Sequence, residues 1–356
     1  MDAILLVGGQ GTRLRPLTAT TPKPMLPTAG VPFLTHQLAA ARDAGVTRAI
    51  LSTSYKSSVF SEHFADGAEL GIELLYATED EPLGTGGGIR HVVDLLRGGP
   101  VFIFNGDVLS GVDLRSLLET HRRTAADVTL YLTQVEDPRA FGLVPTDANG
   151  RVTAFLEKPQ RPEEIVTDQI NAGCYVFEPH VFERIPAGRP VSVERETFPE
   201  LLASGARLSG HLDTTYWLDI GTPQAFVRGC CDLVLGTAPS PARPGPAGPA
   251  LVLDGASVAP DAVLTGGTTV GAGAVVHSGA VLDGSVIFDG AEIGAGATVT
   301  GSVVGRDSSV GAGSVLDCAI VGDGVRIGAR NELRSGVRLW PGAEIGDGLL
   351  RFSSDC

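Results

Sequence analysis

The strongest constraint on the fold is a six-residue repeat in the last third of the 356-residue chain. Aliphatic or Phe residues recur at Val258, Leu264, Val270, Val276, Leu282 and Phe288; the register slips by one before Ile293 and Val299, again before Val304, Val310 and Leu316, and once more before Val321, Ile327, Leu333, Leu339 and Ile345. This period is typical of a parallel β-helix, in which each step forms one flat side and the aliphatic side chain points inward. Residues 251–356 are therefore predicted to form a β-helix domain.

The first 235 residues follow a different pattern, in which short apolar runs alternate with helical periodicity. Strands are predicted at Ala3–Val7, Ala49–Leu51, Ile72–Tyr76, Val101–Phe104, Val128–Val135, Val152–Leu156 and Ala172–Phe177, and a helix at Pro32–Ala44. This alternation indicates an α/β domain with a Rossmann-like mixed, mostly parallel sheet and helices on both faces. Ligands of such sheets bind beyond the carboxyl ends of the strands. Residues 236–250 are rich in Pro and Gly, which predicts an extended linker.

Composition excludes several classes of protein. The net charge is −14 and the isoelectric point is about 4.9, so a nucleic-acid partner is not expected. The cysteines are odd in number and lack metal-ligand spacing, which indicates reduced thiols and a cytoplasmic protein. A basic leader and an apolar run of eighteen residues are both missing, so neither a signal peptide nor a membrane span is expected.

A glycine-rich string, Val7-Gly8-Gly9-Gln10-Gly11-Thr12-Arg13, follows the first predicted strand directly. Glycines allow the backbone to approach phosphates and to turn its N–H groups toward them. Arg13, with Arg15 beside it, and Lys23 in a proline-stiffened segment could neutralise phosphate charge. The string is neither a Walker A loop nor a dinucleotide-binding fingerprint, and a purely structural turn is the alternative.

The longer string from Gly8 to Thr18, followed by Pro22-Lys23-Pro24-Met25, resembles the signature of the sugar-nucleotide pyrophosphorylases. The resemblance covers nearly the whole chain and implies that the β-helix is left-handed. It also implies that the triphosphate of a nucleotide contacts a set of residues in this region. These are Gly8, Gly9, Gly11, Thr12, Arg13 and Lys23, with Leu6 as a further nucleotide-binding residue.

Two aspartates are candidate Mg²⁺ ligands, because Mg²⁺ prefers carboxylate oxygens together with phosphates and water. Asp107 follows the strand Val101–Phe104 in the sequence Asn-Gly-Asp, where a structural turn is the alternative. Asp219 lies shortly before Thr222-Pro223, which is a helix-start signal. The family resemblance implies that both are metal ligands.

The resemblance also implies residues for a sugar 1-phosphate. Lys158 would hold its phosphate and Glu157 would accept hydrogen bonds from sugar hydroxyls, although a solvated surface lysine is the alternative. Asn171 and Gly142 lie in segments that resemble further sugar contacts.

The acidic segment Glu79-Asp80-Glu81 precedes Gly84-Thr85 and is a candidate for recognising the base. Guanine presents N–H donors, so a carboxylate acceptor suits it; Glu81 is the first candidate and Glu79 the second, with a solvated acidic loop as the alternative. Gly84 and Thr85 would line the base pocket, and Tyr55 and Lys56 would flank the nucleotide. Gly86-Gly87-Gly88 replaces an Ala seen after Gly-Thr in many relatives, and this departure is expected to loosen the loop.

Within the family, the resemblance is greatest to enzymes that join GTP and mannose 1-phosphate, giving GDP-mannose and pyrophosphate with Mg²⁺ as cofactor. Glucose-1-phosphate thymidylyl-, uridylyl- or adenylyltransferase activity is the main alternative. An acyltransferase using His277 and a non-catalytic regulatory homologue are the others. The flat sides of a β-helix suit self-association, so a homo-oligomer is expected.

Overall fold

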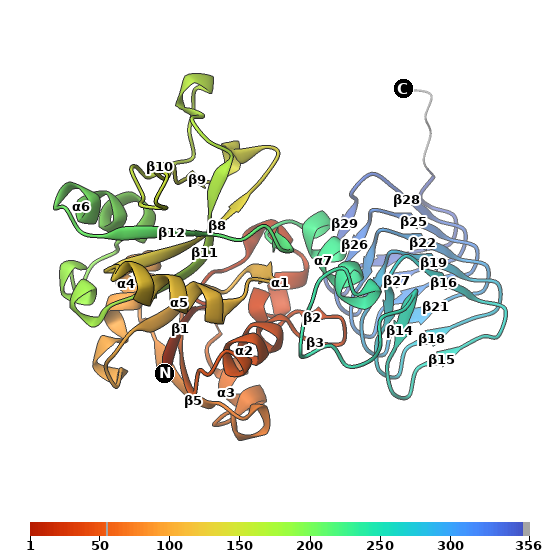
Figure 1. Ribbon diagram of the computed structural model, residues 1–356. Coiled ribbons are helices and arrows are strands. Elements are labelled where there is room, and N and C mark those ends of the chain that lie inside the picture. Colours follow the sequence, from red (N-terminus) through yellow and green to blue (C-terminus); the bar gives the residue numbers. More distant parts are fainter. Residues whose placement is uncertain (55, 352–356) are drawn as a thin grey trace. The chain divides into compact units, whose positions relative to one another are not determined.

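The computed structural model describes residues 1–54 and 56–351, and the chain divides into two compact units. The first unit comprises Met1–Gly9 and Gln37–Trp217, and the second comprises Gln10–His36 and the chain from Leu218 onward. Figure 1 shows the α/β elements and the stacked coils of the β-helix. The chain passes from one unit to the other inside the glycine-rich string, directly after Gly9.

A nine-stranded mixed sheet forms the centre of the first unit. Its strands are β1 Asp2–Leu6, β4 Arg48–Thr53, β5 Glu73–Thr78, β6 Val101–Asn105, β8 Val128–Gln134, β9 Gly142–Leu143, β10 Leu156–Glu157, β11 Gln169–Phe177 and β12 Leu208–Leu212. Seven of the strands follow one another in the order β10-β9-β11-β6-β1-β4-β5. Strand β8 also pairs with β11, and β12 pairs with β8. Strand β1 runs parallel to β4 and β6, whereas β11 runs antiparallel to β6, β8 and β9. The predicted Rossmann-like mixed sheet is thus confirmed.

Helices and short turns connect the strands. The α-helices are α1 Leu17–Thr20, α2 Phe33–Asp43, α3 Ser58–Phe64, α4 Gly84–His91, α5 Leu114–Thr124, α6 Phe198–Ala203 and α7 Pro223–Leu235. The 3₁₀ turns are η1 Thr12–Leu14, η2 Lys23–Met25, η3 Ala68–Leu70, η4 Val93–Leu95, η5 Pro138–Ala140, η6 Pro162–Glu164 and η7 Pro179–Arg184, and η8 Val193–Thr197 is π-helical. Short strands are β2 Pro27–Thr28, β3 Val31–Pro32, β7 Val108–Ser110 and β13 Trp217–Asp219. Helix α7 begins as predicted, with the Thr222 side chain accepting from Ala225 N.

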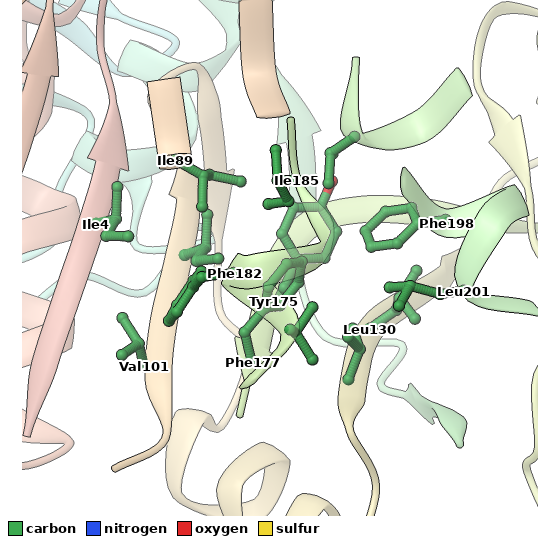
Figure 2. Packing of buried hydrophobic residues seen from close by; sticks show 14 of the residues in the cluster. Ile4, Ile89, Val101, Leu130, Tyr175, Phe177, Phe182, Ile185, Phe198 and Leu201 are labelled. Carbon is green, nitrogen blue, oxygen red and sulfur yellow. The ribbon is translucent and has the colours of Figure 1, made fainter. Parts of the chain in front are cut away.

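Aromatic side chains of β11 and its neighbours fill the core of the first unit (Figure 2). Tyr175 packs edge-on against Phe198 at 5.3 Å between ring centroids, and Phe177 stacks on Phe182 at 6.0 Å. All four are buried. This packing holds β11 rigidly between β6 and β8, so the loops at the ends of these strands start from fixed positions.

The predicted strand Val152–Leu156 is wrong over most of its length, because only Leu156–Glu157 forms a strand. Val152 is buried in the core, but it sits in an isolated bridge opposite Thr146 next to the turn that Gly150 closes with a left-handed φ of 77°. Burial rather than strand pairing therefore explains why Val152 is apolar.

The coils of the second unit form a parallel β-helix of three sheets. One contains β14 Ala250–Val252, β17 Thr268–Val270, β20 Val286–Ile287, β23 Val303–Val304, β26 Ile320–Val321 and β29 Arg338–Leu339; the next contains β15 Ser257–Val258, β18 Val275–Val276, β21 Glu292–Ile293, β24 Ser309–Val310, β27 Arg326–Ile327 and β30 Glu344–Ile345; the last contains β16 Val263–Thr265, β19 Val281–Asp283, β22 Thr298–Thr300, β25 Val315–Asp317 and β28 Glu332–Leu333. All pairings between coils are parallel, consistent with the predicted left-handed β-helix.

One inward position of the predicted repeat is wrong. Ile287, and not Phe288, aligns with Val270 and Val304 on the neighbouring coils and belongs to the apolar core of the β-helix. Because adjacent residues of a strand face opposite sides, Phe288 instead contacts Phe226 of α7 at 6.5 Å between ring centroids. The register slip therefore falls before Ile287, one step earlier than the apolar pattern suggested.

The segment Gly236–Pro249 contains neither helix nor strand, and β14 begins at Ala250. It is nevertheless attached to the rest of the second unit: Gly248 N donates to Val234 O at 3.0 Å, Ser240 Oγ hydrogen bonds with His36 at 2.6 Å, and Ala238 is buried. Within the described part of the chain, every helix is too short or too polar to cross a membrane.

Candidate active site

The first part of the glycine-rich string lies at the carboxyl end of β1, in the first unit. Leu6 ends that strand, and its carbonyl accepts from Gly106 N at 3.0 Å. Gly8 is held by Ser54, whose Oγ donates to Gly8 O at 2.5 Å. A Cβ on Gly8 would lie 2.8 Å from Ser54 Oγ. Gly9 is different, because a Cβ there would have no protein atom within 4 Å. The fold itself therefore gives no steric reason for glycine at position 9.

The second part of the string lies in the second unit, where it meets Asp219. Gly11 adopts a left-handed φ of 60°, and its carbonyl accepts from Thr18 Oγ1 at 2.8 Å. Thr12 is exposed and starts the turn η1, which carries Arg13. A Cβ on Gly11 would lie 3.1 Å from Lys23 Cβ, so the turn packs directly on the base of the Lys23 side chain.

Arg13 and Asp219 lie beside Gly221, and Lys23 lies beside Asp219. A Cβ on Gly221 would overlap Arg13 Nη2 and would lie 2.8 Å from Asp219 Oδ1. Lys23 Nζ lies 4.0 Å from Asp219 Oδ1, and the Lys23 side chain is 9% exposed. Asp219 thus lies close to two predicted cations from the start of the chain, and the absence of a side chain at Gly221 makes room for Arg13 and Asp219.

Asp107 lies in the turn between β6 and β7, in the first unit. Gln37 on α2 holds this turn from both sides: its Nε2 donates to Asn105 O at 2.9 Å and to Val108 O at 3.0 Å. A Cβ on Gly106 would lie 2.5 Å from Leu6 O, so only glycine allows the turn to pack on the end of β1. Gln37 was not predicted from the sequence; an amide side chain between the apolar residues Leu34 and Leu38 of the predicted helix is the signal that could have revealed it.

The two candidate base-reading carboxylates differ in their surroundings. Glu79 is 8% exposed, and its oxygens accept from Ser52 Oγ at 2.9 Å and from Leu83 N at 2.9 Å. Glu81 is exposed. Glu79 therefore stabilises the start of α4, whereas the carboxylate of Glu81 faces solvent.

The expectation that the glycine run loosens this loop is wrong, because Gly84–His91 is helical. Alanine side chains would collide with neighbours: a Cβ would lie 2.8 Å from Val191 Cγ1 at Gly86 and 2.8 Å from Glu79 Oε1 at Gly88. Gly84 has a left-handed φ of 70° and lies against Val191 O. Thr85 Oγ1 donates to Glu194 Oε2 at 2.8 Å and accepts from Val193 N at 2.9 Å. The run thus allows α4 to pack closely against residues 191–194.

The predicted sugar-phosphate residues Gly142, Glu157 and Lys158 are brought together by the pairing of β9 with β10. Gly142 is opposite Glu157, and a Cβ there would lie 2.7 Å from Glu157 Oε2. Lys158 Nζ lies 3.6 Å from Glu157 Oε1. Burial raises the pKa of the Glu157 carboxyl, and the Lys158 ammonium offsets part of that rise.

Asn171 lies on β11, next to β9 in the sheet. Its Nδ2 donates to the Tyr175 hydroxyl at 2.8 Å, and its Oδ1 accepts from Gly173 N at 3.1 Å. Burial raises the pKa of Tyr175 well above its usual value, so this hydroxyl stays neutral. Asn171 is therefore held in one orientation by a rigid core residue.

Several expectations concern groups outside these clusters. Tyr55 lies outside the described residues, and Lys56 has a left-handed φ of 52°. His277 is partly exposed, and its Nε2 lies 2.7 Å from Glu292 Oε1. Over the described ranges, no group of three His, Cys, Asp or Glu residues is arranged to hold a metal ion.

Comparison with known proteins identifies the family. The family model described as "Nucleotidyl transferase" matches residues 2–234, and the "GMPPB C-terminal domain" model matches residues 247–346. The chain is similar to the mannose-1-phosphate guanylyltransferase of Mycobacterium tuberculosis, with 59% identity over all of this chain and 98% of that protein. It is 40% identical to the Drosophila melanogaster mannose-1-phosphate guanylyltransferase catalytic subunit beta over 64% of this chain and 62% of that protein.

A solved structure, HddC from Yersinia pseudotuberculosis, has 28% identity and a TM-score of 0.56 over 64% of this chain and 97% of its own. The same protein has been solved complexed with GMP-PN. The chain belongs to the nucleotidyl transferase family, and it is an enzyme that transfers nucleotidyl groups.

Proposed function

We propose that this enzyme transfers the guanylyl group of GTP to mannose 1-phosphate, giving GDP-mannose and pyrophosphate. The observation that carries the proposal is that Arg13, beside Gly221, and Lys23 both lie close to Asp219 within a nucleotidyl transferase. Two cations beside a glycine-rich turn suit a triphosphate, and the mannose and guanine assignments draw on the names of the relatives.

The reaction is an in-line displacement at the α-phosphorus of GTP. A phosphate oxygen of mannose 1-phosphate forms the new P–O bond, and the bond from the α-phosphorus to the oxygen that bridges it to the β-phosphorus breaks. The electron pair of that bond leaves with pyrophosphate. The attacking oxygen is already anionic, so no protein group has to remove a proton. Arg13, Lys23 and the N–H groups of Gly8, Gly9, Gly11 and Thr12 would neutralise the departing charge, and positioning would supply most of the rate.

Family members of this kind generally use a divalent metal, and we propose Mg²⁺. Asp107 and Asp219 would hold it; both carboxylates are partly exposed, and two carboxylates complemented by phosphate and water oxygens are the donor set that Mg²⁺ prefers. Bound there, the metal would supply charge neutralisation at the α-phosphate.

On the sugar side, Lys158 would hold the phosphate of mannose 1-phosphate, and Glu157, Asn171 and Gly142 would contact the sugar. The close pairing of Gly142 with Glu157 supports this, since any side chain at position 142 would displace the carboxylate. On the base side, Glu81 would accept from guanine, with Glu79 as the alternative and with Leu6, Gly84 and Thr85 lining the pocket. The exposure of Glu81 supports its being available to a ligand.

We further propose that residues 1–235 form the catalytic domain, 236–250 a linker and 251–356 the β-helix domain, and that the enzyme is a cytoplasmic homo-oligomer. The first family model ends at residue 234 and the second begins at residue 247, near the end of this linker, and Cys174, Cys230, Cys231 and Cys318 are free. Limited proteolysis with light scattering would test the boundaries and the oligomer; cleavage elsewhere, or a monomer, would contradict them.

The decisive test of substrate identity is a matrix of nucleoside triphosphates against sugar 1-phosphates, read as pyrophosphate release from the purified protein. The highest kcat/KM is expected for GTP with mannose 1-phosphate. A higher kcat/KM for glucose 1-phosphate with dTTP, UTP or ATP would replace the proposal with that activity. Absence of pyrophosphate release with every pair would favour a non-catalytic homologue.

A further inference from the structure

Residues on or just after three adjacent strands of the β-helix contact the residues that lead from the glycine-rich string to Lys23. Strands β23, β26 and β29 lie side by side in one sheet. Arg306 and Asp323 follow the first two, and Arg338 lies on the third. All of these residues, and the segment Gln10–Lys23, belong to the second unit.

Arg338 makes the contact nearest to the predicted triphosphate site. Its Nη1 donates to the backbone carbonyl of Arg13 at 3.0 Å and to that of Arg15 at 2.9 Å. One guanidinium nitrogen thus holds the middle residue and the C-cap of the short turn that carries the Arg13 side chain. Hydrogen bonds from a charged donor are stronger than neutral ones, so this contact limits the movement of the turn.

Asp323 and Arg306 hold the same segment further along. Thr20 Oγ1 donates to Asp323 Oδ2 at 2.8 Å, and Arg306 Nη1 donates to Thr21 Oγ1 at 3.2 Å. Both β-helix residues are themselves fixed: Asp323 Oδ1 accepts from Arg306 N at 2.9 Å, and the Arg306 guanidinium lies over the Phe288 ring at 5.5 Å. The segment between Arg13 and Lys23 is therefore tied to a rigid surface at two places.

We propose that Arg338 is a positioning residue for Arg13, through which the β-helix holds the segment Gln10–Lys23 in the conformation that binds the triphosphate. The β-helix then contributes to nucleotide binding in addition to any role in self-association. The consequence for catalysis rests on the proposed function, whereas the ordering of the segment does not.

The test compares the full-length wild-type protein with Arg338→Ala, Arg338→Lys and the control Arg326→Ala. Arg326 is an exposed arginine on β27, in another sheet of the same β-helix, and its side chain has no hydrogen bond or ion pair within the described residues. Hydrogen exchange of the peptide spanning residues 10–23 is measured without nucleotide, and KM for GTP and for mannose 1-phosphate are measured separately.

Arg338→Ala is expected to speed exchange of residues 10–23 and to raise KM for GTP about tenfold, while KM for mannose 1-phosphate stays within about twofold. Arg338→Lys is expected to recover part of both losses, because an ammonium can still donate to a carbonyl. Exchange in Arg338→Ala that matches both wild type and Arg326→Ala would overturn the proposal. Wild-type protein without GTP-dependent activity would instead refute the proposed function and leave the exchange result to decide the role of Arg338.

Discussion

Glycine is frequent in two regions of this protein, the string after β1 and the coils of the β-helix, for different reasons. In the coils, the backbone of the next coil occupies the place of a side chain: a Cβ on Gly294 would lie 2.6 Å from Ala312 N, and one on Gly305 would overlap the Gly322 carbonyl. In the string, Gly9 has open space at the same position and no left-handed φ.

The difference shows how a glycine required by the fold can be separated from one available for a ligand. Glycine carries an entropic cost, so a position that needs neither a special φ nor close packing calls for another explanation. Close approach of the backbone to a phosphate is such an explanation. Gly221 is intermediate, since its missing side chain makes room for Arg13 and Asp219, which are themselves candidate site residues.

The largest effect in this comparison is expected for Gly305→Ala in the β-helix. Its Cβ would overlap backbone atoms, which cannot rotate away, so the free energy of unfolding should fall by about 3 kcal/mol. Gly324→Ala is the control, because it has a φ of 67° but open space and should lose only about 1 kcal/mol. Equal losses in denaturant titrations would show that the coils do not require glycine for packing.

Gly221→Ala should affect activity more than stability. The new methyl group displaces the flexible end of Arg13 and crowds Asp219, so kcat/KM should fall on the order of tenfold to a hundredfold while the melting temperature changes little. Gly245→Ala, where the nearest atom is 3.8 Å away, should behave as wild type. A normal kcat/KM for Gly221→Ala would remove Arg13 and Asp219 from the proposed site.

Gly9→Ala should weaken nucleotide binding without any loss of stability. A methyl group at position 9 meets no protein atom, but it would meet a phosphate held against the backbone, so KM for GTP should rise about tenfold. Steady-state kinetics and thermal unfolding on the same sample test this. Unchanged KM would mean that the nucleotide does not approach Gly9.

The smallest effect is expected for Glu157, the carboxylate on which Gly142 packs. Burial raises the pKa of Glu157, so the folded state favours the protonated acid; the stability it contributes is present below pH 4.5 and is lost as pH rises through the higher folded-state pKa. Glu157→Gln should therefore flatten the fall in unfolding free energy over that window. The unfolding free energy would be measured by denaturant titration at several pH values. If it depended on pH in Glu157→Gln as it does in wild type, the raised pKa of Glu157 would be contradicted.

The β-helix was largely predictable because its repeat is local: each coil uses the same inward positions, and the single error, Phe288 for Ile287, arose where both adjacent residues are apolar. The sheet was predictable in class but not in strand order, because the antiparallel insertion of β11 depends on pairing between distant segments. Arg13, Lys23 and Asp219 were each predicted, but the approach of Asp219 to the two cations is set by packing between distant segments. Gln37 and Arg338 were missed because each acts on backbone carbonyls, which leave no motif.

Turnover of full-length Asp107→Ala, measured as pyrophosphate release from GTP and mannose 1-phosphate with Mg²⁺ present, tests the central claim most directly. The account predicts a loss of at least about a hundredfold relative to wild type, with thermal unfolding nearly unchanged, because Asp107 lies in a turn held by Gln37 and Gly106. Near-normal pyrophosphate release by a folded Asp107→Ala protein would contradict the proposed metal site.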